Sequence, residues 1–238
     1  MSHLLHGQQQ SSLRSIREQL QNRYGRIRDE HRLDPVSQFV RCFIGSRTHD
    51  LTSWNAFLRL MIRFRDWDAI ADAAVAEIEA ELKDVTYPEK KAPDLQLALQ
   101  KIRVRAGAIN LDFLEDFAEE PALIWLEQIH GVGPKIAAAT LNFSTLRKRC
   151  FVIDSHVLRV LQRFGFVDPK AGFKDAYRAI MAAAEGFDAD GLYELHWHLK
   201  NLGQYLCTKQ EAFCGDCPLS EICMKRIEGP AWFPRPAA

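Results

Sequence analysis

Four cysteines lie within seventeen residues near the C-terminus, with the spacing C-x6-C-x2-C-x5-C: Cys207, Cys214, Cys217 and Cys223. Four thiols this close in sequence can all point at one metal centre, but they make a poor disulfide framework. The polar N-terminus has no apolar segment typical of a signal peptide, so we expect a cytoplasmic protein. In a reducing cytoplasm such a cluster more often binds metal than forms disulfides, and the sequence therefore predicts a C-terminal metal centre.

The overall composition is that of an ordinary globular chain, with 47% hydrophobic and 26% charged residues among 238. No apolar run approaches the roughly 18 residues of a membrane span, so no membrane is expected. The 31 basic residues equal the 31 acidic ones, and this balance does not by itself mark a nucleic-acid binder. Basic residues are locally concentrated in the N-terminal segment and at 147–149, which permits DNA binding without showing it.

The hydrophobic pattern is helical almost throughout. Asp34 and Pro35 are typical of an N-cap followed by a first-turn proline, and a helix ending near Gly45 follows. Asp50 can cap the next helix, whose apolar residues Leu51, Trp54, Leu58, Met61 and Ile62 are expected on its inner face. Further helices are expected over 69–82, 95–106, 121–129, 134–143, 156–164 and 192–206. With no alternating strand pattern, the sequence predicts an all-α protein.

A Gly-Val-Gly turn lies between two of these expected helices, at Gly131, Val132 and Gly133. Glycine adopts positive φ readily, and its missing side chain lets backbone N–H groups approach a phosphate. The N-terminus of the following helix adds a favourable dipole for an anion. The same turn can also serve helix–helix geometry alone, so the motif favours a DNA-binding hairpin without requiring one.

Lys135 follows this turn, and Asp154 stands at the start of another expected helix. A lysine amine beside a DNA-binding hairpin can attack an electrophilic sugar carbon and form a Schiff base. Attack at neutral pH requires an unprotonated amine, which partial burial and basic neighbours would favour. The carboxylate can stabilise positive charge or transfer protons. Taken singly, Lys135 can be a phosphate contact or a solvated residue, and Asp154 can simply cap its helix.

The hairpin with Lys135, the Val152–His156 segment with Asp154 and the four-cysteine pattern, in this order, resemble the endonuclease III family. Its members are base-excision-repair DNA glycosylases of the helix-hairpin-helix superfamily, and the resemblance extends from about residue 36 to 223. It implies two helical domains with a DNA-binding cleft between them. Residues 36–147 would form a six-helix barrel that contains the hairpin. Residues 148–238, together with 1–35, would form a domain holding a 4Fe–4S cluster.

The resemblance also implies roles for individual residues. Lys135 matches the nucleophile and Asp154 the catalytic aspartate of enzymes that release a damaged base and then cleave the strand by β-elimination. Gly131, Val132 and Gly133 would anchor the DNA backbone. The four cysteines match the cluster ligands one for one; a zinc site is the alternative, although zinc sites favour two separated C-x2-C halves.

Four further residues are candidate DNA contacts by the same resemblance. Arg47 stands where the family has a residue that fills the gap left by a flipped base, and Tyr87 falls near an intercalating wedge, although it can also be a core tyrosine. His156 and Lys209 complete the set, the latter in the cluster loop 208–213. His130 and Pro134 depart from the family, which usually has proline and often a basic residue at these positions.

These observations predict a monomeric DNA glycosylase with AP-lyase activity on damaged bases, with pyrimidines as the expected class, in double-stranded DNA. One alternative is a monofunctional glycosylase acting on uracil or a mismatched base, with water as the nucleophile. An adenine-type enzyme fits less well, since it carries a further C-terminal domain and this sequence ends soon after Cys223. The other alternative is a non-catalytic DNA-binding protein, although such a protein needs neither Lys135 nor Asp154.

Overall fold

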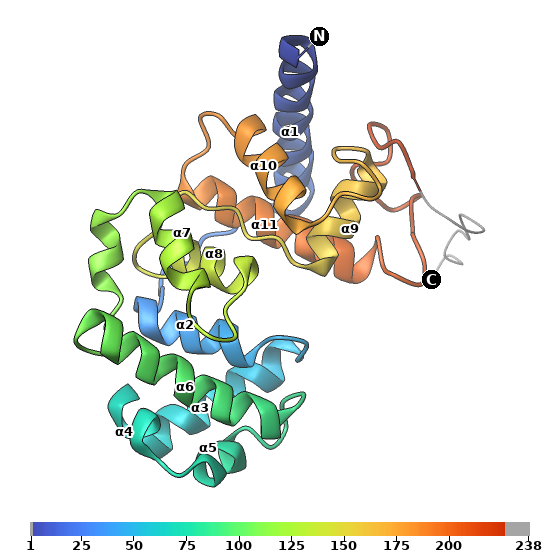
Figure 1. Cartoon of the computed structure of the whole chain (residues 1–238). Coiled ribbons are helices and arrows are strands. Elements are labelled where there is room, and N and C mark those ends of the chain that lie inside the picture. Colours follow the sequence, from blue (N-terminus) through green and yellow to red (C-terminus); the bar gives the residue numbers. More distant parts are fainter. Residues whose placement is uncertain (1, 227–238) are drawn as a thin grey trace. The chain divides into compact units, whose positions relative to one another are not determined.

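A computed structural model describes the backbone of residues 2–226 and the side chains of residues 12–226. This part of the chain contains eleven α-helices, one short 3-10 helix and no strand (Figure 1). The predicted all-α class is confirmed. No helix among these residues combines the length and apolar character needed to cross a bilayer.

The chain divides into two compact units. The continuous unit comprises residues 31–148, and the split unit combines residues 1–30 with residues 149–238. The sequence placed these boundaries at 35/36 and 147/148. In the structure they lie at 30/31 and 148/149, so residues 31–35 belong to the unit that contains the hairpin.

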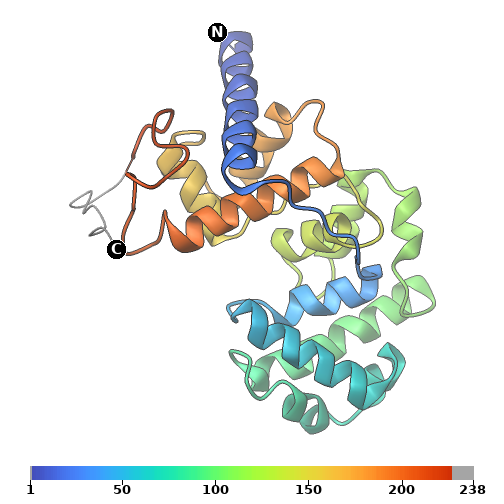
Figure 2. The same cartoon turned by 180° about the vertical axis from the view of Figure 1, so that it is seen from behind.

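The continuous unit contains the following elements: α2 (Pro35–Ile44), α3 (Asp50–Phe64), α4 (Trp67–Asp72), α5 (Val75–Glu81), α6 (Pro88–Ala106), η1 (Asp112–Asp116), α7 (Glu119–Glu127) and α8 (Pro134–Phe143). Helix α2 packs against α3, α6 and α8, and α6 also packs against α4 and α5 (Figure 2). Phe39, Val40 and Ile44 of α2 are fully buried. The apolar stripe of α2 therefore forms the centre of this unit.

The ends of these helices follow local chemistry. Asp34 caps α2 as predicted, since its Oδ1 accepts the Ser37 N–H at 2.9 Å. The single helix expected over 69–82 is instead α4 and α5, separated by extended backbone at Ala73. The side-chain amide of Gln96 donates to the Ala73 carbonyl at 2.6 Å, which stabilises this break. Helix α6 begins at Pro88, earlier than the expected Leu95.

The predicted inner face of α3 is wrong. Leu51 and Ile62 are 72% and 81% exposed, whereas Ala56, Leu60 and Phe64 are buried. The helix carries two apolar stripes, and the choice depends on Phe57, whose ring stacks on Trp54 at 5.4 Å and approaches Trp67 of α4 at 6.2 Å. The N-cap of α3 is His49 and not Asp50.

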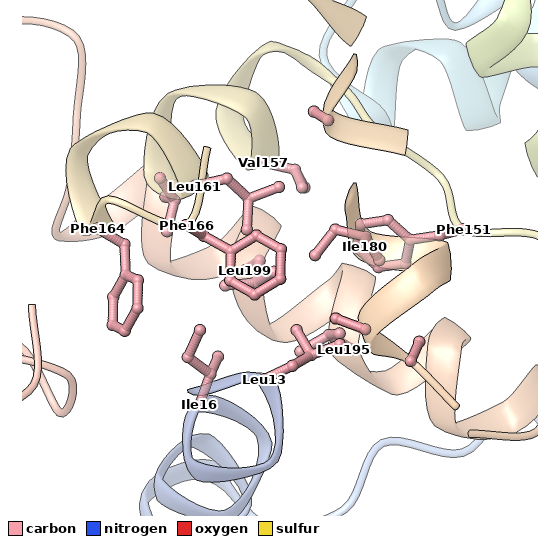
Figure 3. Packing of buried hydrophobic residues seen from close by; sticks show 14 of the residues in the cluster. Leu13, Ile16, Phe151, Val157, Leu161, Phe164, Phe166, Ile180, Leu195 and Leu199 are labelled. Atoms are coloured by element: carbon pink, nitrogen blue, oxygen red, sulfur yellow. The ribbon is translucent and has the colours of Figure 1, made fainter. Parts of the chain in front are cut away.

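The split unit contains α1 (Ser2–Tyr24), α9 (Ser155–Phe164), α10 (Phe173–Ala183) and α11 (Ala189–Tyr205). Helix α9 packs against α11, and α1 packs against α10. Figure 3 shows Leu13 and Ile16 of α1 meeting a core that includes Phe151, Leu161 and Leu199. Helices α1 and α10 were not predicted, although the buried positions 13, 16 and 20 of α1 follow helical spacing.

Several basic residues of the N-terminal segment and of the run at 147–149 have partners within the protein. Lys148 donates through Nζ to the carbonyls of Glu115 and Phe117, both at 2.6 Å. Arg149 donates to Phe187 O at 2.8 Å. Arg17 of α1 pairs with the buried Glu194 of α11 at 3.4 Å. The basic run at 147–149 is therefore used largely to hold loops in place. Cys150 is buried, whereas Cys42 is half-buried.

Candidate functional site

The hairpin between α7 and α8 uses its two glycines differently. Gly131 has φ +78°, whereas Gly133 has φ −105°, so only the first needs the left-handed region. A Cβ at Gly131 would lie 2.8 Å from Cζ of Phe43 on α2, whereas a Cβ at Gly133 would meet nothing within 4 Å. Gly131 thus serves the turn and its packing. Gly133 leaves open space at the start of α8.

Val132 is buried, and its N–H donates to Ile129 O at 3.1 Å. The valine therefore holds the hairpin together from inside. His130, at the same turn, contacts Asp94 of α6, with Nε2 and Oδ1 3.1 Å apart. The hairpin is in this way fixed to both α2 and α6 before any ligand is bound.

A pair of glycine substitutions separates these two roles. Gly131→Ala should destabilise the protein by roughly 2 kcal/mol, since alanine is strained at positive φ and its Cβ meets Phe43. Gly133→Ala should cost less than half as much, because its φ and the surrounding space accept a methyl group and only the lower preference of alanine for an N-cap opposes it. Thermal unfolding of the two variants checks this, and an equal loss of stability would contradict it.

Helix α8 begins with Pro134 at its first position, followed by Lys135 and Ile136. The backbone N–H groups of a first helical turn have no partner within the helix, so this terminus favours an anion. Ile136 is buried against the core, whereas the Lys135 side chain is exposed. The expected partial burial of Lys135 is therefore wrong. Its basic environment includes Lys91, whose pKa is lowered by burial and then by the charge of Lys135.

Arg47 and Tyr87 come from different loops of the continuous unit, and the structure brings these loops together. Thr86 Oγ1 donates to the Arg47 carbonyl at 2.8 Å. Both residues adopt the left-handed backbone region, with φ +57° and +58°. Tyr87 is 54% exposed, so the alternative of a core tyrosine is wrong.

Asp154 lies in the split unit as the N-cap of α9. Its side chain is buried, and Oδ1 accepts the N–H groups of His156 and Val157, both at 2.8 Å. The structure therefore confirms that Asp154 caps α9. A carboxylate at a helix N-terminus is stabilised in its charged form, so the same geometry suits an electrostatic role.

The four cysteines come together in the split unit, where they line one cavity. All four are free thiols. Burial raises the pKa of Cys217 to about 11, and the charges of Cys207, Cys223 and Cys214 add to this effect, while a backbone hydrogen bond from Leu219 opposes it. Val160, Phe164, Leu202 and Leu219 supply apolar walls to the cavity. Four half-buried thiols that influence one another form a donor set suited to a cationic centre.

The arrangement bears on which centre fits. Among the side chains that the structure describes, those of residues 12–226, no group of three or more His, Cys, Asp or Glu is arranged to hold a metal ion. A tetrahedral zinc site requires every sulfur about 2.3 Å from one ion. An iron–sulfur cluster binds each cysteine to a different iron, which separates the sulfurs more widely. The four thiols around this apolar cavity are a donor set that either centre can use, so the iron and zinc content of the purified protein distinguishes the two.

Two arginines of α9 hold the first cysteine segment. Arg159 donates through Nε to Cys207 O at 2.9 Å, and Arg163 donates to Thr208 O at 2.5 Å. His156 packs against Gly203 of α11 and is half-buried, whereas Lys209 is exposed. Sequence analysis missed both arginines, although their i, i+4 spacing on one helix was available as a signal.

An all-α fold with a glycine hairpin, an aspartate that caps a helix and a cavity lined by four cysteines is typical of helix-hairpin-helix repair proteins. The profile of the family described as "HhH-GPD superfamily base excision DNA repair protein" matches residues 40–186. The chain belongs to this superfamily, and with it to the base-excision-repair DNA glycosylases. The resemblance to endonuclease III is confirmed at this level.

Curated relatives agree with this assignment. Endonuclease III of Sulfolobus acidocaldarius is 23% identical over 214 residues, which cover 84% of this chain and 93% of that protein. "DNA glycosylase/AP lyase ROS1" of Arabidopsis thaliana is 27% identical over 172 residues, which cover 66% of this chain. The match covers only 12% of ROS1, so the chain spans about a tenth of the length of this plant relative.

Solved structures show the same fold. A trapped endonuclease III–DNA covalent intermediate matches with a TM-score of 0.74 at 18% identity, covering 91% of this chain and 96% of that chain. A thermostable thymine-DNA glycosylase matches with a TM-score of 0.72 at 15% identity, covering 92% and 97%. At these identities the likeness concerns the fold alone.

Proposed function

We propose that this chain is a bifunctional glycosylase that removes damaged pyrimidines from duplex DNA and then cleaves the strand. The observation that carries the proposal is the exposed primary amine of Lys135 in the first turn of α8, directly after the glycine hairpin. A phosphate held by the N-terminus of α8 would bring the adjoining sugar to this amine.

The chemistry follows from the amine. The lone pair of Lys135 Nζ attacks C1′ of the extruded nucleotide, and the C1′–N bond breaks with its electron pair leaving on the base, which takes up a proton. Loss of a proton from nitrogen and opening of the sugar give a protonated Schiff base. Removal of a proton from C2′ then expels the 3′ phosphate by β-elimination. Asp154 would stabilise the positive charge that develops on the sugar.

We further propose that Cys207, Cys214, Cys217 and Cys223 hold a 4Fe–4S cluster. When bound, the cluster supplies a structural cross-link, since four ligands from one short segment are tied to a single centre. With α9 arginines fixing the first of these segments, the loop 208–213 and its exposed Lys209 would be presented as one rigid element toward the DNA backbone.

Replacing Cys217 with serine should therefore remove absorbance near 400 nm and lower the iron content from about four per chain. We also expect the Tm to fall by several degrees, because the segment loses its cross-link. Cys42→Ser is the matched control, since Cys42 lies outside the cavity. Retention of zinc instead of iron in the purified wild-type protein would contradict the cluster.

Duplex DNA containing a damaged base or an abasic site is the proposed partner, bound by a monomer in the cytoplasm, or at the nucleoid if the protein is bacterial. Gly131, Val132 and Gly133 would position the backbone, with Arg47 and Tyr87 meeting the gap left by the flipped nucleotide. His156 is also proposed as a contact; the residue is half-buried, its Cβ lies against Gly203, and its Nδ1 lies 3.2 Å from a guanidinium nitrogen of Arg159.

Borohydride trapping of the wild-type protein on a panel of duplexes tests the function. The panel contains an abasic site, oxidised pyrimidines, uracil and mismatched thymine, with an undamaged duplex as the control. A covalent adduct with a damaged duplex supports the proposal and identifies the base. Base release without any adduct would favour the monofunctional alternative, for which the fold shared with a thymine-DNA glycosylase is the supporting observation. Binding without release would favour the non-catalytic alternative.

A further inference from the structure

Arg47 and Tyr87 are held in a conformation that neither residue prefers. Both have φ near +60°, a region that side chains with a Cβ rarely adopt. Both are also exposed, so core packing of their side chains does not compensate for this strain. Backbone strain of this kind persists only where surrounding contacts enforce it, and it is concentrated at functional sites.

Hydrogen bonds between the two loops enforce the conformation. Thr86 Oγ1 donates to the carbonyl of Arg47 at 2.8 Å. The backbone N–H of the same Thr86 donates to Thr48 Oγ1 at 3.0 Å. The residues next to Arg47 and Tyr87 are thus tied to one another, and the two exposed side chains are presented by one connected structure.

Lys91 lies beneath this structure and completes it. The residue is only 9% exposed, although it carries an ammonium group. Its Nζ donates to Ile44 O at 2.7 Å, to Ser46 O at 2.6 Å and to Thr48 Oγ1 at 3.0 Å. These three acceptors match the three N–H donors of an ammonium group. Lys91 therefore fixes the end of α2 and the loop that carries Arg47.

Burial opposes the charge of this ammonium, and its three hydrogen bonds offset only part of the cost of desolvation. Burial, and after it the nearby charge of Lys135, lowers the pKa of Lys91 to about 8. Lys91 thus binds the loop that carries Arg47, and it is also close enough to Lys135, the proposed nucleophile, for their charges to interact. An apolar residue here would remove one hydrogen bond from each of two carbonyls, those of Ile44 and Ser46.

We propose that Lys91 is a positioning residue that holds the Arg47 loop and the Tyr87 loop in their inserting conformation before DNA binds. The inference rests on the proposed function, in which these two side chains enter the gap left by the flipped nucleotide. With the loops already strained and fixed, insertion requires no further ordering at the moment of flipping. Without Lys91, the loops relax and must be reordered on the DNA.

The test measures the rate of nucleotide flipping. The signal is the fluorescence of 2-aminopurine placed next to an abasic site in duplex DNA. In Lys91→Met, which keeps the length of the side chain, the fluorescence rise should be at least about 10-fold slower than in the wild type. Lys91→Arg should restore part of the rate, since a guanidinium can donate to the same acceptors. Lys90→Met removes an exposed lysine from the same helix and should flip at the wild-type rate.

A double-mutant cycle distinguishes positioning from general stability. If Lys91 acts through the loops, adding Lys91→Met to an Arg47→Ala/Tyr87→Ala protein should slow flipping little further. Additive effects, or an unchanged flipping rate in Lys91→Met, would overturn the inference. Should Lys91→Met fail to fold, Thr86→Val decides instead, because it removes only the bond to Arg47 O and should slow flipping measurably. A wild-type protein that neither flips nor traps DNA would overturn the proposed function as well.

Discussion

Replacing Lys135 with glutamine should abolish the borohydride-trapped adduct and lower strand cleavage at an abasic site by at least about 1,000-fold. The reason is chemical, since an amide cannot form a Schiff base. DNA binding should weaken only modestly, because the hairpin and the N-terminus of α8 remain. The measurement is single-turnover cleavage, with binding followed separately at the same ionic strength.

Lys170→Gln provides the control, since it removes an equally exposed lysine from the split unit. Its adduct yield should match that of the wild type. Because Lys135 is exposed, its replacement should leave the Tm unchanged, so any loss of activity can be assigned to chemistry. Undiminished trapping in Lys135→Gln would show that another amine is the nucleophile.

Replacing Asp154 with asparagine should lower the rate of base release by on the order of 100-fold or more, with little change in stability. Asparagine is as good an N-cap as aspartate, so the two hydrogen bonds to the α9 backbone can be kept while the charge is lost. The substitution therefore separates the capping role seen in the structure from the proposed catalytic role. Base release in a single turnover and thermal unfolding are measured in parallel.

Asp34→Asn is the matched control, because Asp34 also caps a helix and lies in the continuous unit. It should affect stability as little as Asp154→Asn does and leave base release unchanged. Alanine variants complete the comparison: each should lose about 1 kcal/mol through the missing cap. Wild-type base release in Asp154→Asn would reduce Asp154 to a cap.

Local patterns were sufficient for much of this fold. The helices α2, α8 and α9 were predicted nearly to the residue, because proline or aspartate marks the start of each and one clear apolar stripe follows. The hairpin glycines were identified because they form a Gly-Val-Gly turn between two expected helices. The error in α3 has the opposite cause: two apolar stripes compete there, and only the contacts of Phe57 with Trp54 and Trp67 decide between them.

The candidate site divides in the same way. Residue type and spacing along the chain were sufficient to propose roles for Lys135, Asp154 and the four cysteines, and these roles stay predictions. Arg47 and Tyr87 were also proposed from the sequence, but their backbone strain and the role of Lys91 beneath them were not. The hydrogen bonds that hold this conformation join segments about forty residues apart in sequence. No local pattern in the sequence indicates such a contact.

The sequence by itself determined the helical class and indicated a candidate metal-ligand set and candidate reactive groups, since these depend on side-chain chemistry and on periodicity within single segments. Only the tertiary structure decided which glycine needs positive φ, that Lys135 is exposed, and that a buried ammonium holds two loops. The physical reason is that burial, strain and hydrogen-bond partners are set by segments distant along the chain, and these become neighbours only when the chain folds.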